Sequence, residues 1–149
     1  MLNPALGRVG EVIAVDDHIL RTLAEAGYVP VICSVATDDT HQPLNVNADL
    51  AASAIASAVD ASKLILLTDT DGVLADKHNP ESVISRLSRQ DAQSMIDTGK
   101  ADQGMIPKLQ SAISALDHGV GTVHMINGGL ENALLIEVFT DAGIGTMVS

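Results

Sequence analysis

The chain has 149 residues, 46% of them hydrophobic, with one Phe, one Tyr and no Trp. This length and composition suit a single domain, residues 1–149, with an aliphatic core. The formal net charge of −11, from 19 acidic and 8 basic residues, argues against nucleic acid or an anionic membrane surface as a partner.

The first part of the chain predicts two short strands on either side of a helix. Apolar patterning predicts a strand at residues 10–15 and a buried strand at residues 29–34. Between them, residues 17–26 are expected to form a helix that ends at Gly27. A polar loop follows at residues 37–43, and the next helix begins in the polar cluster after it.

The rest of the chain alternates strands with helices. The run at residues 63–68 is almost wholly apolar, as parallel strands are when both faces of their sheet are covered. This alternation predicts an α/β three-layer sandwich with a mostly parallel sheet, in which ligands bind beyond the carboxyl ends of the strands. Further elements are expected as a connection at 69–87, helices at 88–98, 105–118 and 131–139, and strands at 122–126 and 146–149.

A cluster at residues 104–108 places a lysine at the start of a helix. Apolar residues at helical spacing begin at Met105, and Pro107 is tolerated only in the first turn of such a helix. Lys108 therefore adds a positive charge to a helix end whose free N–H groups are already positive. Together they would form a cradle for a phosphate or an oxyanion. The alternative is that Lys108 simply points into water.

A second polar cluster, at residues 45–49, precedes another apolar helical stripe. Asn47 or Asp49 falls where short polar side chains cap a helix, and capping alone could explain either residue. However, Asn45, Asn47 and Asp49 supply more polar groups than one cap requires. The surplus is a candidate for holding a substrate.

Residues 69–74 follow the apolar strand at 63–68 and form a candidate ligand loop. Ordinary turn chemistry would also account for its Asp and Gly residues. The sequence from Leu64 to Leu74 also matches the nucleophile motif of haloacid-dehalogenase-type phosphatases, with Asp69 as the nucleophile and Asp71 as the acid and base. That interpretation is weak, because no acidic pair follows the strand at 122–126 to hold its metal ion.

The two polar clusters, residues 64–74 and residues 134–146 together resemble the acetylglutamate kinases of the amino-acid kinase family, in order as well as spacing. The resemblance runs from about Gly10 to the last residue. It implies the amino-acid kinase fold and the transfer of a phosphoryl group from ATP to the side-chain carboxylate of N-acetyl-L-glutamate, a step of arginine biosynthesis. Because the chain has few basic residues, a polyphosphate would also need a divalent ion such as Mg²⁺.

The resemblance also implies roles for individual residues. Asn45, with Asn47 as a further candidate, would bind the acetylated amino acid. Asp49 would organise the active-site lysines, and Lys108 would stabilise the transferring phosphoryl group. The nucleotide-binding candidates are Thr68, Asp69, Thr70, Asp71, Gly72, Val73, Leu74, Lys100, Ala101 and Asp102.

The chain departs from the family at its N-terminal side. Family members carry an N-terminal lobe with a lysine-bearing phosphate loop, a Gly-Gly substrate contact and a clamping arginine, and nothing before Gly10 supplies these groups. Losing several charge-stabilising groups should leave little or no kinase activity in this chain alone. The alternative is a non-catalytic nucleotide-binding or regulatory module.

Further partners and the compartment follow from the resemblance and from composition. Residues 137–146 resemble the arginine-sensitive branch of the family, so arginine is a candidate inhibitor. A PII-type signalling protein is another candidate partner, and we expect a homo-oligomer or a complex with the missing lobe. The single Cys33, scattered histidines and the absence of a long apolar run predict a cytoplasmic protein without a metal site of its own.

Overall fold

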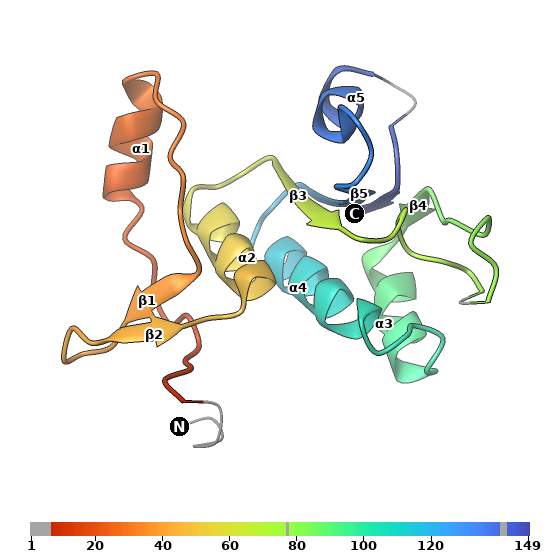
Figure 1. The fold of residues 1–149 in the computed structure, drawn as a ribbon, viewed down its shortest axis with the longest axis horizontal. Helices are drawn as coiled ribbons and strands as arrows, with labels where there is room; N and C mark the ends of the chain where they lie inside the picture. Colours follow the sequence, from red (N-terminus) through yellow and green to blue (C-terminus); the bar gives the residue numbers. More distant parts are fainter. Residues whose placement is uncertain (1–6, 77, 141–142) are drawn as a thin grey trace.

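The computed structural model describes residues 7–76, 78–140 and 143–149 (Figure 1). A small hairpin and one helix precede a larger α/β unit. The helices are α1 (His18–Glu25), α2 (Ala48–Ala58), α3 (Arg89–Asp97), α4 (Met105–Asp117) and α5 (Ala133–Phe139). The strands are β1 (Val35–Thr37), β2 (Pro43–Asn45), β3 (Lys63–Thr68), β4 (Arg86–Leu87), β5 (Thr122–Asn127) and β6 (Thr146–Val148).

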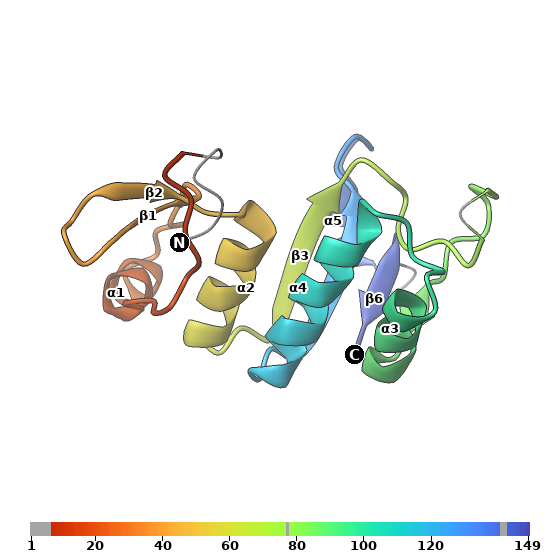
Figure 2. The same ribbon diagram turned by 90° about the horizontal axis from the view of Figure 1, so that it is seen from below.

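The main sheet has the strand order β3-β5-β6-β4. β3 runs parallel to β5 and β4 parallel to β6, whereas β5 and β6 are antiparallel. Helices α2, α4 and α3 lie along one face of the sheet (Figure 2), and α5 lies on the other (Figure 1), which gives three layers. The predicted α/β class and its mostly parallel sheet are therefore confirmed.

The core lies between the sheet and the layer formed by α2, α3 and α4. It is aliphatic, as the composition predicted, because almost no aromatic side chains are available. Leu109 of α4 is fully buried against Val123 and Met125 of β5, and α3 contributes Ala92 and Met95. Burial on this scale is what anchors the first turn of α4 beside the carboxyl end of β3.

Most predicted elements after residue 45 are confirmed, with ends that differ by one or two residues. Asn47 has an extended backbone and its side-chain oxygen accepts the Leu50 N–H at 3.1 Å, so it is the N-cap of α2. Ser88 caps α3 in the same way by accepting the Asp91 N–H. Each cap fixes where its helix begins.

The two strands predicted near the N-terminus are wrong. Residues 10–15 and 29–34 have no strand assignment, and Ile13, Val29 and Val31 are 90%, 87% and 96% exposed. A strand requires a neighbour that satisfies its backbone groups, and neither segment pairs with the main sheet in the part of the chain that the structure describes. Both segments therefore have the apolar pattern of a strand without a partner strand in the main sheet.

Gly145 lets β6 approach β5 closely. Its backbone has a φ of +87°, and a Cβ atom there would lie only 2.2 Å from the carbonyl oxygen of Met125. Only glycine tolerates both conditions.

Among the described residues, no helix is both long and apolar enough to cross a bilayer.

Candidate functional site

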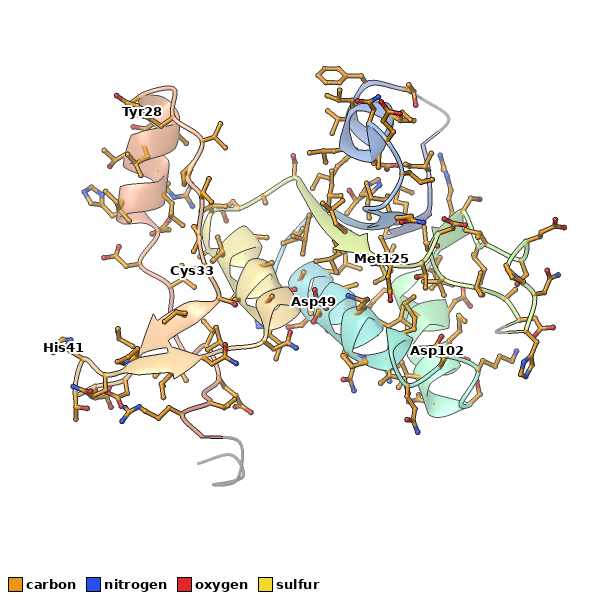
Figure 3. All side chains as sticks on the ribbon, viewed as in Figure 1. Tyr28, Cys33, His41, Asp49, Asp102 and Met125 are labelled. Atoms are coloured by element: carbon orange, nitrogen blue, oxygen red, sulfur yellow. The ribbon has the colours of Figure 1, made fainter. Side chains whose placement is uncertain are left out.

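Lys108 and Asp49 form an ion pair between α4 and α2. The Lys108 Nζ lies 3.1 Å from Asp49 Oδ2, and both side chains are about three-quarters buried. The two helices pack side by side, and Ser53 Oγ of α2 donates to the Ser111 carbonyl of α4 at 3.1 Å. Figure 3 shows Asp49 between these helices. The predicted convergence of Lys108 and Asp49 is confirmed.

Beside this pair lies a cavity of about 640 Å³, at the carboxyl end of β3. Its position follows from the packing of α4 against the parallel strands, which brings the first turn of the helix to the end of β3. Lys108 is the cation in its lining, which comprises Leu67, Thr68, Asp69, Thr70, Asp102, Gly104, Met105 and Lys108.

The tip of α4 does not offer the free N–H groups that the sequence predicted. The Met105 N–H binds both the side chain and the carbonyl of Asp102, and the Ile106 N–H binds the same carbonyl at 3.0 Å. Pro107 has no N–H to offer. The predicted backbone cradle at these three positions is wrong, because Asp102 satisfies it, and the ammonium group of Lys108 is left as the donor to an anion.

Residues 69–74 form a loop that two later segments hold in place. The Asn127 side-chain amide donates to Asp71 Oδ1 at 2.7 Å, and Thr146 Oγ1 accepts the Val73 N–H at 2.8 Å. Neither contact was predicted from the sequence, since the partners are 56 and 73 residues apart. A local pattern does not encode such pairs.

The structure gathers only part of the predicted ligand set around the cavity. Thr68, Asp69, Thr70, Asp102 and Lys108 line it. The others lie outside the lining: Asn45 and Asn47 are exposed near the start of α2, Gly72, Val73 and Ala101 are buried, Leu74 is half-buried, and Asp71 and Lys100 are exposed.

The charge around the cavity is unfavourable for an anion on its own. Asp69 and Asp102 line it and Asp49 borders it, against the single ammonium of Lys108. A phosphate would therefore need a counterion. No group of three or more His, Cys, Asp or Glu side chains is placed to hold a metal ion among the residues that the structure describes.

A second polar cavity, of about 490 Å³, lies beside α5. Glu137 is buried there, and its carboxylate accepts hydrogen bonds from His124 Nδ1 and from the Ile144 N–H. Burial lowers the pKa of His124 below its ordinary value, and the hydrogen bond to Glu137 opposes that shift. Thr140 and Gly143 also line this cavity.

The model of the amino acid kinase family matches residues 2–127. The chain belongs to this family. It is 52% identical over 143 residues to the acetylglutamate kinase of Symbiobacterium thermophilum, a match that covers 96% of this chain and 49% of that protein. It is 46% identical over 144 residues to the acetylglutamate kinase of Methanocaldococcus jannaschii, covering 97% and 48%. The chain thus spans about half the length of these curated relatives.

Solved structures of the same fold are also similar. The N-acetylglutamate synthase of Neisseria gonorrhoeae, complexed with coenzyme A and L-arginine, matches with a TM-score of 0.87 and 29% identity, covering 97% of this chain and 33% of that one. The isopentenyl phosphate kinase of T. acidophilum matches with a TM-score of 0.66 and 21% identity, covering 95% and 56%, and supports the fold alone.

The family match decides against the phosphatase interpretation of residues 64–74. Asp69 and Asp71 belong to an amino acid kinase loop, and the Asp71 carboxylate is engaged by Asn127. The resemblance to acetylglutamate kinases predicted from the sequence is confirmed by the same comparisons.

Proposed function

We propose that this chain forms a single domain that holds the nucleotide and the transferring phosphoryl group in an acetylglutamate kinase. The reaction would move the γ-phosphoryl group of ATP to the side-chain carboxylate of N-acetyl-L-glutamate. The observation that carries this proposal is the Lys108–Asp49 pair at a cavity at the carboxyl end of β3. Identities of 46% to 52% with acetylglutamate kinases support the choice of substrate.

Lys108 would stabilise the charge of the transferring phosphoryl group. An ammonium group has three N–H donors, and one of them is directed to Asp49 at 3.1 Å. Two therefore remain for phosphate oxygens. Because the side chain is largely buried, its charge is less screened than that of an exposed lysine.

Asp49 would position Lys108 and would take no part in bond making. Its carboxylate fixes the ammonium group in one place, so that the lysine does not have to be ordered during the reaction. Asp49 itself lies in the first turn of α2, which Asn47 caps. Asn47 therefore fixes the start of α2, α2 places Asp49, and Asp49 holds Lys108 beside the cavity.

The nucleotide would occupy the cavity lined by Thr68, Asp69, Thr70 and Asp102, with the rest of residues 69–74, Lys100 and Ala101 contributing from outside the lining. Mg²⁺ bound to the phosphates would offset their charge, which the acidic surroundings require. The protein's own part is to supply Lys108 as a fixed cation and to orient the phosphates toward the acceptor.

We propose that Asn45 and Asn47 face the acetylated amino acid. Asn45 ends β2, and only residue 46 separates it from the N-cap of α2. The Asn47 oxygen is used in capping, so its NH₂ group remains available as a donor. Both side chains are exposed on the approach to Asp49, which suits binding of a carboxylate or amide group of the acceptor.

We further propose that L-arginine binds as an inhibitor in the cavity beside α5. The buried Glu137 carboxylate accepts two hydrogen bonds and has lone pairs left for a guanidinium group. Binding of arginine to this chain, lost in Glu137→Gln and retained in the exposed control Glu131→Gln, would support this assignment. Arginine binding that is equal in all three proteins would refute it.

The exposed Cys33 suits a reducing compartment, and we propose the cytoplasm. A PII-type partner and a homo-oligomer stay predictions of the resemblance. Lys108 is the one cation in the lining of the described cavity, so we expect the chain alone to bind Mg·ATP with little turnover.

Calorimetry with Mg·ATP tests the proposal. Wild type should bind, and Lys108→Ala should bind about tenfold more weakly or worse, because a charge-assisted bond is lost. Lys63→Ala is the matched control, since Lys63 lies at the opposite end of β3 from Thr68. Absence of binding in wild type, or equal loss in both variants, would refute the proposal.

A turnover assay separates the remaining alternatives. ADP release that depends on acetylglutamate, and that Lys108→Ala abolishes, would establish a kinase that needs no other chain. Mg·ATP binding without turnover would favour a nucleotide-binding module. Hydrolysis of a generic phosphate ester, abolished by Asp69→Asn, would restore the phosphatase interpretation.

A further inference from the structure

Asn127 is the last residue of β5 and lies opposite Thr68, the last residue of β3, in the parallel register. Its side chain uses both ends of the amide. The Nδ2 group donates to Asp71 Oδ1 at 2.7 Å, and Oδ1 accepts the Gly129 N–H at 2.8 Å. Asn127 therefore joins the loop at residues 69–74 to the turn after β5.

The other side of the same loop is fixed by a buried residue. Thr146 is 1% exposed, accepts the Val73 N–H at 2.8 Å and donates to the Ile84 carbonyl at 2.6 Å. Gly72, next to Val73, has a φ of +141°, and a Cβ atom there would lie only 2.6 Å from Thr146 Oγ1. The buried half of the loop is thus fixed by packing, and its exposed half depends on Asn127.

Asp71 is the exposed residue of this loop that Asn127 binds. It does not line the cavity, whereas Asp69 and Thr70, immediately before it, do. The amide of Asn127 holds the Asp71 carboxylate at the end of β5, outside the lining that already contains Asp69 and Asp102.

We propose that Asn127 is a positioning residue for the nucleotide. It acts through Asp71, by ordering the loop before the ligand arrives and by keeping a negative charge away from the phosphates. This inference rests on the proposed function, in which residues 69–74 receive the nucleotide. Ordering a loop in advance removes an entropic cost from binding.

The most selective variant is Asn127→Asp. A carboxylate still accepts the Gly129 N–H, but it lacks the donor to Asp71 and places two acids against each other. The matched control is Asn132→Asp, which adds the same charge in the same connection. The Asn132 side chain makes no capping bond, and its φ of +57° is one that Asp tolerates. Asn127→Ala is a second, uncharged variant.

Hydrogen exchange in the absence of nucleotide tests the positioning directly. Peptides that cover residues 69–74 should exchange about fivefold faster in Asn127→Ala and Asn127→Asp, the effect of losing one hydrogen bond, and should be unchanged in Asn132→Asp. Unchanged exchange in the Asn127 variants would overturn the inference. This readout does not need nucleotide binding, so it remains informative if wild type fails to bind Mg·ATP, an outcome that refutes the proposed function instead.

Mg·ATP affinity, measured on proteins whose Tm shows that they are folded, is the second readout. Asn127→Ala should bind about fivefold more weakly than wild type. Asn127→Asp should bind about tenfold more weakly near pH 7.5, and its affinity relative to wild type should recover toward pH 5.5, as one proton shared by the two carboxylates restores the bond. A deficit that does not depend on pH, or that equals the deficit of Asn132→Asp, would contradict a positioning role.

Discussion

Two regions of this chain have similar apolar content and different outcomes. Residues 46–149 build a sheet covered by helices, with side chains such as Leu109 and Met125 fully buried. Residues 7–45 form one helix and a small hairpin, and several of their aliphatic side chains, including Ile13, Val29 and Val31, remain exposed. An apolar strand pattern therefore becomes a strand only where a neighbouring strand satisfies its backbone hydrogen bonds.

Truncating a buried side chain should cost far more stability in residues 46–149 than truncating an exposed one in residues 7–45. Leu109→Ala should lower the free energy of unfolding by about 3 kcal/mol, because it leaves a cavity between α4 and β5. Val31→Ala should change it by less than about 0.5 kcal/mol, because nothing packs on that side chain. Urea denaturation followed by circular dichroism measures both. Equal losses would show that the N-terminal region is packed in solution.

A smaller effect is expected at the buried contact between β6 and the ligand loop. Thr146→Val should lower the free energy of unfolding by about 1–3 kcal/mol, because the buried Val73 N–H loses its acceptor. Thr146→Ser keeps the hydroxyl group and should retain most of the stability. The same denaturation experiment distinguishes the two, and a valine variant as stable as wild type would show that the Val73–Thr146 hydrogen bond does not stabilise the fold.

At the cavity, Asp49→Asn should weaken Mg·ATP binding less than Lys108→Ala does. The amide still offers an oxygen acceptor to the lysine, and the change removes a negative charge from the neighbourhood of the phosphates. Calorimetry on the two variants in parallel gives the ranking. A loss in Asp49→Asn as large as that in Lys108→Ala would mean that the pair contributes more than positioning.

The smallest effect concerns pH. Because burial lowers the folded-state pKa of His124, the unfolded chain binds more protons, and stability should fall as pH drops through about 6.5 toward that lowered pKa. His124→Gln should reduce this decline in Tm. A wild-type Tm that is flat from about pH 7.5 to 5.5, or that rises on acidification, would contradict the direction of the shift.

The sequence predicted the part of the fold that local patterns determine. A capping cluster marked the start of α2, and the expected helices at 88–98 and 105–118 are α3 and α4. The resemblance to acetylglutamate kinases implied that Asp49 organises the active-site lysines, and Lys108 does pair with Asp49. The strand predictions at 10–15 and 29–34 failed, because periodicity does not show whether a partner strand is present.

The remaining site features depend on contacts between distant residues. The bond from Asn127 to Asp71 and the bond from Val73 to Thr146 join segments with no shared pattern. The role of Asp102 was missed for a different reason. Its side chain and carbonyl satisfy the first amides of α4, and a sequence does not show whether an N–H group faces a ligand or a nearby carboxylate.

Labelling with an acyl phosphate of ATP tests most directly whether Lys108 faces the phosphates. A lysine within reach of the γ-phosphate attacks the acyl carbon, forms an amide and releases ATP, and mass spectrometry identifies the modified peptide. We expect rapid labelling of Lys108 that excess Mg·ATP suppresses, with only slow, unsuppressed labelling of Lys63. Labelling of Lys108 that is no faster than that of Lys63, or that ignores added ATP, would contradict it.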